Sequence, residues 1–487
     1  PVLPRGGGTS QCGQTVGRAI VLDTSRHLDE IGLLLNREGG EGKPTRRAGE
    51  HEGLEIEVQP GVVLDHLNAR LKRDGLWFPV DPSTANRATL GGMAGNNSAG
   101  ARSIRYGMMV DNVSAMEVVL PDGRRLWVGE GADESTTMPE ELSVLRALFA
   151  REQEEIERRT PRTMRNVAGY NLDRLHPDRE NLASLLIGSE GTLAFFSRLR
   201  LRLSPLPARR ALGVCHFPSR LEALDVVRHL VDLTPSAIEL VDGGVLRLAA
   251  ERPAFREAMS HFIQGALESL LLVEFASEDP RADLRRDLEA LTSLLGDLGY
   301  PDCVTFAETP ADQAEVWSVR KAGLGIVMSM AGPRKPISFI EDCAVPLEHL
   351  AEYARRVDEI FARHGTDGTW YAHASVGCLH VRPALNLKDP DDVGLIRRIA
   401  EETHEIIREF KGTHSGEHGD GILRSEFLPT MVGARLSAAY KEVKKTFDPR
   451  GVMNPGKIVD PPRMDDRNLF RYPPDYTPRE LPVVLDW

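Results

Sequence analysis

The sequence lacks the features that mark several large classes of protein. Its five cysteines are scattered over 487 residues without a C-x-x-C pair, which excludes a disulfide framework, a zinc knuckle or an iron–sulfur cluster built from these residues. No apolar run approaches the roughly 20 residues of a membrane-spanning helix. The net charge of -12 leaves no basic stripe for a nucleic-acid backbone. We therefore expect neither a transmembrane segment nor a nucleic-acid partner.

The few cysteines also fit a reducing compartment. We expect a cytoplasmic protein, with peripheral contact at the inner face of a membrane as the one membrane association left open. The chain lacks an initial methionine and begins at Pro1, almost inside a glycine-rich motif. We expect it to be a fragment of a longer protein.

The first 200 residues contain a mixture of strand and helix patterns. Short β-type runs occur at 19–23, 54–59 and 116–120, and helical patterns occur at 62–72 and 139–159. Such a mixture predicts an α+β fold for this part of the chain.

The second half of the chain has the pattern of a sheet accompanied by helices. A stretch rich in Arg and Pro at 202–210 indicates a domain boundary, because proline disfavours a continuous helix or a central strand. Long helices such as 346–364 separate the predicted strands, so we expect a sheet with helices on one face. The strands are predicted at 211–217, 237–241, 270–275, 304–307, 337–341 and 369–374.

Three segments of the first 200 residues are rich in glycine and small polar residues: 4–10, 89–100 and 187–193. Glycine permits left-handed dihedrals and close approach, so successive N–H groups can point at phosphate oxygens. No Lys-Ser or Lys-Thr pair follows at P-loop spacing and no G-x-G-x-x-G is completed in the first segment, which excludes both of those phosphate loops there. One such loop could be a plain turn, whereas three in order indicate a binding site.

In their order these segments resemble the FAD-binding domain of the vanillyl-alcohol-oxidase superfamily, of the PCMH type. Its members carry P-R-G-G-G-T-S, D-P…T-x-G-G…N-x-x-G, R-Y-G and G-S-E-G-T, and the resemblance implies that the first loop receives the FAD pyrophosphate. The neighbours of Cys12 give no reason to expect covalent attachment, so we expect non-covalent FAD. The residues implied for FAD binding are Arg5, Gly6, Gly7, Gly8, Thr9, Ser10, Pro82, Thr89, Gly91, Gly92, Asn96, Ser98, Gly100, Gly188, Glu190, Gly191 and Thr192.

A second cluster combines histidines and an acid. If residues 375–377 form a hairpin turn, His373 and His380 become near-opposite residues on paired strands, with Cβ atoms roughly 5 Å apart. Cross-strand histidines also occur as plain surface pairs, but Glu417 and His418 follow in a glycine-flanked turn about 40 residues later. Two histidines and a glutamate form a common catalytic set for a divalent metal, with zinc as our first candidate.

This part of the chain resembles the D-2-hydroxyacid dehydrogenases of the same superfamily, the D-lactate, D-2-hydroxyglutarate and glycolate oxidase type. They share an H-x6-H pair, an S-G-E-H-G element and a closing F-D-P…N-P-G-K segment, here at 447–457. The resemblance implies His373, His380 and Glu417 as metal ligands and His418 as the base. It also implies Arg320 and Lys335 as catalytic groups that bind the substrate carboxylate.

One departure from the family concerns Arg382, which stands where many members have a smaller polar residue. It could bind a further substrate carboxylate, as in 2-hydroxyglutarate, and a structural ion pair is an equally open alternative. The expected chemistry is oxidation of a D-2-hydroxyacid, D-lactate or D-2-hydroxyglutarate, to the 2-oxoacid. The metal polarises the hydroxyl, His418 accepts its proton and the α-hydrogen passes to the flavin as hydride.

The resemblance also implies a domain organisation. We expect an N-terminally truncated FAD-binding domain at 1–206, an antiparallel-sheet substrate (cap) domain with the metal site at 207–440, and a segment at 441–460 that returns to the FAD domain. Residues 461–487 resemble the junction of longer fused members, so we expect a linker there. If the full protein continues, a 4Fe–4S domain would pass electrons to a quinone or cytochrome pool.

Three alternatives stay open at this point. The chain could be a flavin oxidase that uses oxygen, a metal hydrolase without flavin, or a flavin electron-transfer module without catalysis. The sequence does not distinguish the hydroxyacid, the metal or the acceptor.

Overall fold

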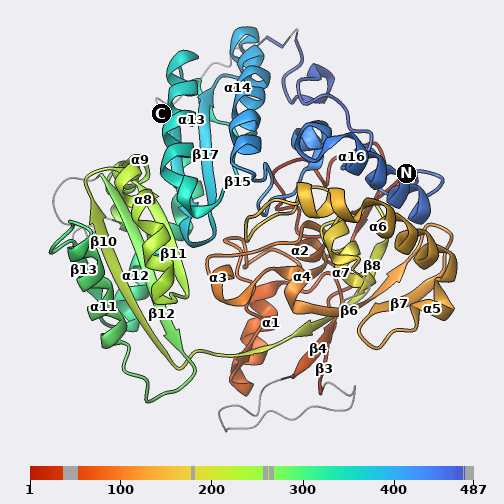
Figure 1. Cartoon of the computed structure of the whole chain (residues 1–487), viewed down its shortest axis with the longest axis horizontal. Coiled ribbons are helices and arrows are strands. Elements are labelled where there is room, and N and C mark those ends of the chain that lie inside the picture. Colours follow the sequence, from red (N-terminus) through yellow and green to blue (C-terminus); the bar gives the residue numbers. More distant parts are fainter. Residues whose placement is uncertain (37–52, 177–180, 256–261, 263–267, 475, 478–487) are drawn as a thin grey trace, which may run out of the picture.

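The computed structural model describes residues 1–36, 53–176, 181–255, 262, 268–474 and 476–477. Its first half is built on a five-stranded antiparallel sheet of order β3-β4-β8-β6-β7 (Figure 1). A parallel pair of strands, β1-β2, precedes this sheet in the chain. The strands are β1 Val2–Arg5, β2 Ile20–Asp23, β3 Ile31–Leu35, β4 Glu55–Val58, β5 Leu76–Trp77, β6 Val113–Val119, β7 Arg125–Gly129, β8 Phe195–Arg202 and β9 Ser204–Pro205. The helices are α1 Leu64–Leu71, α2 Leu90–Asn96, α3 Ser103–Tyr106, α4 Met109–Asn112, α5 Glu134–Thr137, α6 Pro139–Arg159 and α7 Leu182–Leu186.

The helix predicted at 139–159 forms with these bounds, for local reasons. Pro139 begins it, acidic residues occupy its first turn and Arg158 and Arg159 its last, which suits the helix dipole. Leu142, Leu145 and Leu148 are buried, as their spacing indicates.

The second half contains an eight-stranded antiparallel sheet of order β13-β10-β12-β11-β16-β17-β14, in which β15 also pairs with β17. The strands are β10 Arg209–Phe217, β11 Ala237–Asp242, β12 Ser269–Ser277, β13 Val304–Ala307, β14 Lys335–Pro336, β15 Cys343–Ala344, β16 Gly368–His373 and β17 Cys378–Leu385. The helices after β10 are α8 Arg220–Leu230, α9 Gly243–Ala250, α11 Arg285–Asp297, α12 Pro310–Val327, α13 Leu350–Arg363, α14 Pro390–Glu409, α15 Gly421–Arg424 and α16 Leu428–Phe447. The antiparallel sheet and the α+β class agree with the sequence prediction.

Two expectations for this sheet need correction. Helices α8, α11, α13 and α14 share one apolar core with it, but α9 and α12 pack in a second core on its other face. The predicted strand at 337–341 is absent, and only Lys335–Pro336 pairs there. Phe339 and Ile340 are buried without a continuous ladder, because the backbone turns at Asp342, whose φ is 72°. Burial rather than strand pairing explains the apolar run.

The end of the chain returns to the first half of the molecule. Helix α16 lies beside α6 (Figure 1), and Leu428, Val432 and Leu436 enter the N-terminal core. Farther on, Met464 is buried and Asp465 pairs with Arg397 of α14. The linker predicted from 461 therefore contains residues that pack on α14, and its residues 475 and 478–487 lie outside the described part.

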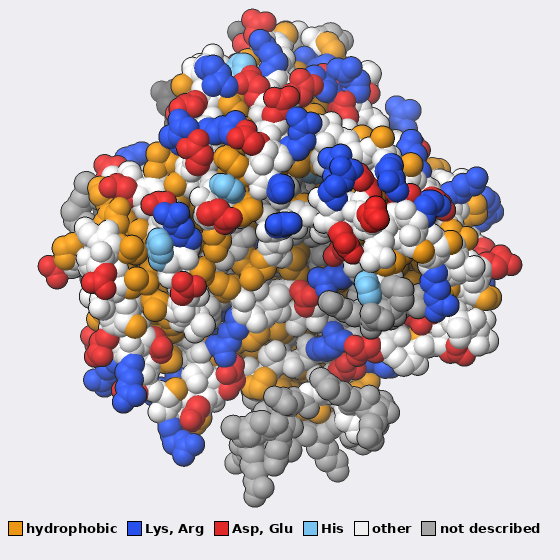
Figure 2. Space-filling view, in the orientation of Figure 1, with side chains coloured by type: hydrophobic (Ala, Val, Ile, Leu, Met, Phe, Trp, Pro, Cys, Tyr) orange, Lys and Arg blue, Asp and Glu red, His pale blue; other side chains and the backbone are white. Residues whose placement is uncertain are grey.

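The surface and the helices add two observations. On the face drawn in Figure 2, acidic and basic side chains are interspersed. None of the helices in the described residues has the length and apolar character needed to cross a membrane.

Candidate functional site

Strand alternation in β16 and β17 brings the two predicted histidines to one face of the sheet. The side chains of Trp370 and Leu379 lie in the core under α8 and α13. His373 and His380 are an odd number of residues away from them along the same strands, so their side chains point to the other face of the sheet. The register pairs His380 with Tyr371, two residues before His373, so the histidines are diagonal neighbours with ring centroids 5.0 Å apart. The hairpin turn expected at 375–377 is present: residues 374–377 connect the two antiparallel strands, with a short 3-10 segment at Ala374–Val376.

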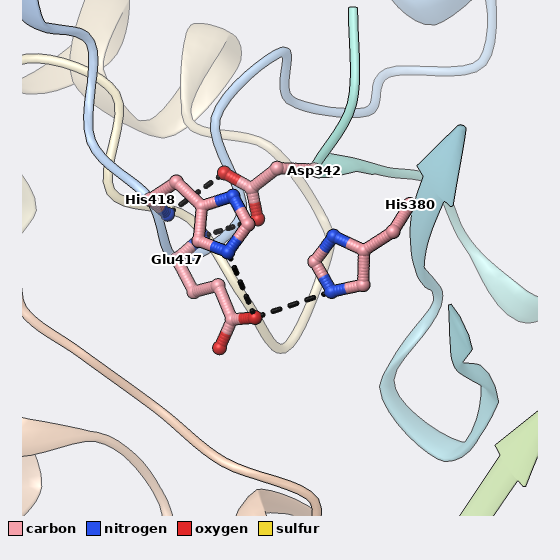
Figure 3. A group of neighbouring side chains, drawn as sticks. All are labelled: Asp342, His380, Glu417 and His418. Carbon is pink, nitrogen blue, oxygen red and sulfur yellow. Dashed lines mark hydrogen bonds and ion pairs between the residues drawn. The ribbon is translucent and has the colours of Figure 1, made fainter. Parts of the chain in front are cut away.

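Three imidazoles converge on one carboxylate oxygen, Oε1 of Glu417. It lies 3.1 Å from Nε2 of His373, 3.2 Å from Nε2 of His380 and 3.5 Å from Nε2 of His418. Figure 3 shows the rings of His380 and His418 directed at Glu417. Ligand atoms about 2.0 to 2.2 Å from a zinc ion stand roughly 3.0 to 3.5 Å apart, so this donor set fits a divalent metal.

His373 is oriented from behind by Glu239 of β11. Its Nδ1 lies 2.7 Å from Oε1 of Glu239, an arrangement that leaves the Nε2 lone pair directed at the cluster. Burial alone would lower the pKa of His373, but the nearby carboxylates of Glu239 and Glu417 together raise it. The other oxygen of Glu239 pairs with Arg320 at 2.6 Å. Arg320, which we expected to bind substrate, thus also compensates a buried carboxylate.

His418 has a matching partner in Glu341, which is fully buried. Nδ1 of His418 lies 3.0 Å from Oε1 of Glu341, whose other oxygen lies 2.6 Å from Nε of Arg382. Burial alone would lower the pKa of His418, but Asp342 and Glu341 raise it to about 9. Arg382 is 3% exposed, and its pairing with Glu341 is the ion pair that one of the two alternatives from the sequence predicts.

Burial has the opposite net effect on His380. It lowers the pKa of this histidine to about 4, and the neighbouring His418 and His373 act in the same direction. His380 is therefore neutral at physiological pH, the state that a metal ligand requires.

Asp342 holds the turn that carries Glu417 and His418. Its carboxylate accepts hydrogen bonds from the backbone N–H groups of Gly416, Glu417 and His418, and it lies 2.7 Å from Nη1 of Arg424. An oxygen of Asp342 lies within 4.8 Å of donor atoms of His380, Glu417 and His418 (Figure 3). Because its oxygens are engaged by these donors, we assign Asp342 to the support of the turn.

Four residues that were not predicted from the sequence contact this cluster: Glu239, Glu341, Asp342 and Arg165, which pairs with Glu417 at 2.8 Å. A signal existed for Glu239 and for the adjacent Glu341 and Asp342, since these acids interrupt apolar runs. A buried charge is costly unless it is paired, so such an acid indicates a buried partner. Nothing comparable distinguished Arg165.

The glycine segments meet around a cavity between β1, α2 and the start of β8. Eight of the residues implied for FAD line it: Arg5, Gly6, Ser10, Gly91, Gly92, Asn96, Glu190 and Gly191. Lining residues that the sequence analysis did not single out are Pro4, Gln14, Thr15, Thr24, Pro60, Gly95, Ala194, Phe195 and Phe196.

Glycine is required in this cavity for two different reasons. A Cβ on Gly6 would lie 2.0 Å from Oγ1 of Thr89, and a Cβ on Gly91 would lie 2.4 Å from Cβ of Pro60. Neither position has room for a side chain, because the glycine backbone packs directly against these two side chains. A Cβ on Gly95 would meet no atom within 4 Å, which leaves its backbone open to the cavity. Arg5 adds an exposed guanidinium. An accessible backbone at Gly95 and the positive charge of Arg5 are suited to binding a pyrophosphate, which is an anion.

The other residues implied for FAD do not line the cavity; they are Gly7, Gly8, Thr9, Pro82, Thr89, Ser98, Gly100, Gly188 and Thr192. Several support the loops: the Thr89 side chain caps α2, and Thr192 bonds to Tyr170 at 2.8 Å. Glu190 is buried, and its carboxylate accepts from the N–H groups of Asp420 and Gly421. Burial, together with Asp420, raises the pKa of Glu190 to about 8.

Hydrogen bonds join this cavity to the histidine cluster. The carbonyl oxygen of His418 accepts from Nε2 of Gln14 at 2.5 Å and from Nδ2 of Asn96 at 3.4 Å. Asn96 also donates to Oγ of Ser10. The cavity and the cluster are therefore adjacent parts of one site. Lys335, by contrast, lies on β14 and donates to the carbonyl oxygen of Met330.

Cys12 lies behind the first glycine loop. It is completely buried, and burial raises the pKa of its thiol far above the usual value. Its carbonyl oxygen accepts from the N–H of Ile422, which ties the loop to α15.

Comparison with known proteins identifies relatives along most of the chain. It is 34% identical over 479 residues to a D-2-hydroxyglutarate dehydrogenase of Pseudomonas putida, an alignment that covers 94% of this chain and 45% of that protein. It is 32% identical over 485 residues to the Escherichia coli protein of the same name, with 95% and 46% covered. A mitochondrial D-lactate dehydrogenase (cytochrome) of Arabidopsis thaliana is 29% identical over 468 residues, with 95% and 69% covered. The chain thus spans about half the length of the first two relatives.

Among solved structures, an alkyldihydroxyacetonephosphate synthase superposes with a TM-score of 0.60 at 16% identity, covering 94% of this chain and 71% of that one. This likeness supports the fold. Two family descriptions match the sequence directly: an FAD binding domain at residues 1–129, and the C-terminal domain of FAD linked oxidases at residues 206–458. Because the second match alone covers more than half of the chain, this protein belongs to the FAD-linked oxidases.

Proposed function

We propose that this chain is the flavin- and metal-dependent catalytic part of a D-2-hydroxyacid dehydrogenase that oxidises D-2-hydroxyglutarate or D-lactate to the 2-oxoacid. One observation carries the proposal. The turn that bears Glu417 and His418 is hydrogen-bonded through the His418 carbonyl to Gln14 and Asn96 of the FAD cavity. The names of the relatives support the substrate class.

The cofactors would be held by residues already described. FAD fits the cavity lined by Arg5, Gly6, Gly95 and Asn96 without covalent attachment, and a divalent metal, zinc first, fits His373, His380 and Glu417. A bound flavin would supply an acceptor for the hydride of the α-carbon, and a bound metal would supply a Lewis acid for the hydroxyl oxygen.

The chain itself supplies the base and the orientation. Without a metal, the acidic neighbours of His418 favour its protonated ring. The positive charge of a bound metal would favour the neutral ring, whose Nε2 faces the cluster and would accept the hydroxyl proton, while Glu341 fixes the ring through Nδ1. Arg320 and Arg382 already pair with Glu239 and Glu341, so a substrate carboxylate would bind the guanidinium N–H groups that remain. We propose Lys335 as a further cation for the carboxylate.

The reduced flavin needs an electron acceptor, for which we propose an iron–sulfur domain, a quinone or a cytochrome. We also propose the division into an FAD-binding domain at 1–206, a cap domain at 207–440, a returning segment at 441–460 and a linker from 461. A 4Fe–4S cluster would have to be bound by residues beyond this chain, since its five cysteines form no ligand motif.

The test is a visible spectrum followed by anaerobic substrate addition. The purified chain supplemented with FAD should show a flavin band that bleaches with D-2-hydroxyglutarate or D-lactate and not with the L-isomers. His418→Ala should keep the band and lose the bleaching, whereas the exposed control His66→Ala should behave as the parent chain. Absence of a flavin band would favour the hydrolase alternative, and rapid reoxidation by air would favour the oxidase.

A further inference from the structure

Arg165 is a fully buried charged group at the histidine cluster, and it belongs to the N-terminal half of the chain. Its relative exposure is 0%, and its Nη1 lies 2.8 Å from Oε2 of Glu417. The three imidazoles approach the other oxygen, Oε1. The two oxygens of Glu417 therefore have separate partners.

The rest of the Arg165 guanidinium is anchored to the segment that follows α2. Its Nε and Nη2 donate to Oγ of Ser103 at 3.0 and 2.8 Å, and Nη2 also donates to the carbonyl oxygen of Gly100. Arg165 thus reaches from a segment next to the FAD cavity to the carboxylate of the cluster.

The backbone around Arg165 is fixed against the same turn. The N–H of Val167 donates to the carbonyl oxygen of Ser415 at 2.9 Å, and the N–H of Gly169 donates to Asp420 at 2.7 Å. Thr413 donates to the side chain of Asn166 at 2.9 Å. Since both sides of Glu417 are tied to residues 166–169, the position of Arg165 relative to Glu417 is set by the fold.

We propose that Arg165 is a positioning residue that makes Glu417 a one-oxygen metal ligand. By engaging Oε2 it leaves Oε1 as the single donor, at the point where the imidazoles converge. This inference rests on the metal site of the proposed function.

The experiment measures Co²⁺ binding to the FAD-loaded chain by chelator competition and records the visible spectrum of bound Co²⁺. Arg165→Met should weaken Co²⁺ binding about 10- to 100-fold, the usual effect of losing a residue that orients a ligand. It should also shift the Co²⁺ bands, because Glu417 can then bind through both oxygens. Arg165→Lys should recover part of the affinity, since one ammonium can meet Glu417 but not Gly100 and Ser103 as well.

Arg220→Met is the matched control. Arg220 is also a largely buried arginine that pairs with two carboxylates, Asp242 and Asp358, but it begins α8, a helix of the apolar core under the opposite face of the sheet. It should leave Co²⁺ affinity and spectrum unchanged. Equal effects of the Arg165 and Arg220 variants would overturn the positioning role, as would an unchanged Co²⁺ spectrum in both Arg165 variants. If Arg165→Met does not fold, Arg165→Lys decides the question. Failure of the parent chain to bind Co²⁺ would overturn the metal site itself.

Discussion

At the scale of single residues, the site is built from buried charges that cancel in pairs. Arg320 faces Glu239, Arg382 faces Glu341, Arg424 faces Asp342 and Arg165 faces Glu417. Removing one member of a buried pair leaves an uncompensated charge, which is far costlier than replacing both. The pairs therefore hold the site residues in place.

We expect Asp342→Asn to destabilise the chain by about 3 to 5 kcal/mol, because it leaves Arg424 buried and unpaired. The amide can also present N–H groups to the three backbone donors of the turn. Urea unfolding measures the loss. Arg424→Met should cost a similar amount and the double variant less than the sum; strict additivity would show that the two residues do not stabilise each other.

A second prediction concerns His404 of α14, which is buried and whose ring nitrogens have no hydrogen-bond partner in the described structure. Burial, reinforced by His414 and Arg424, lowers its pKa well below 6.5. The unfolded chain therefore takes up a proton below pH 6.5 that the folded chain does not, and stability falls by about 1.4 kcal/mol per pH unit.

His404→Leu should flatten this loss between pH 6.5 and 5.5, as measured by urea unfolding at several pH values. The exposed His66→Leu should leave the pH dependence unchanged. An unaltered slope in the His404 variant would assign the acid sensitivity to other groups.

At the scale of elements, the turn between β16 and β17 fixes the distance between His373 and His380. Gly377 has φ of 73°, and a Cβ there would lie 2.1 Å from the carbonyl oxygen of Val345. Gly377→Ala should therefore cost more than the roughly 1 to 2 kcal/mol of a left-handed alanine, and it should weaken metal binding by moving the strands.

Gly365→Ala is the control for this turn. Its φ of 64° is similar, but nothing lies within 4 Å of the added Cβ, so only the conformational cost should appear. Thermal unfolding and Co²⁺ titration of both variants provide the comparison. Equal effects would mean that the contact with Val345 is not what holds the turn.

At the scale of the whole molecule, the C-terminal segment is hydrogen-bonded to residues that line the cavity between β1, α2 and β8. Nδ2 of Asn454 donates to the carbonyl oxygens of Gln14 and Glu190, and its N–H donates to Val2 of β1. Three regions far apart in the sequence thus meet at Asn454.

Asn454→Ala should weaken FAD binding about tenfold, because two side-chain hydrogen bonds of about 0.5 to 1.5 kcal/mol each are lost where the loops are joined. Fluorescence of released flavin measures the affinity. Asn68→Ala also removes two bonds to backbone groups, those of Phe78, away from the cavity, and should leave FAD affinity unchanged. Tight FAD binding by the Asn454 variant would contradict this role for the C-terminal segment.

The sequence by itself determined the elements and the chemistry they carry. Local signals placed α6 at 139–159 and β13 at 304–307, because caps, periodicity and β-branched residues act over a few neighbours. The glycine segments identified the FAD-binding family, and the H-x6-H pair with Glu417 and His418 named residues that the fold brings together.

Only the tertiary structure decided which residues support the side chains of the histidine cluster. The partners of His373, Glu417 and His418 are Glu239, Arg165 and Glu341, separated from them by 77 to 252 residues. The diagonal register of His373 and His380 and the buried turn at Asp342 were likewise outside the reach of local patterns. The physical reason is that a buried charge is stabilised by an opposite charge that lies close to it in the folded structure. Sheet register and domain packing set that distance, and the separation of the two residues along the chain does not predict it.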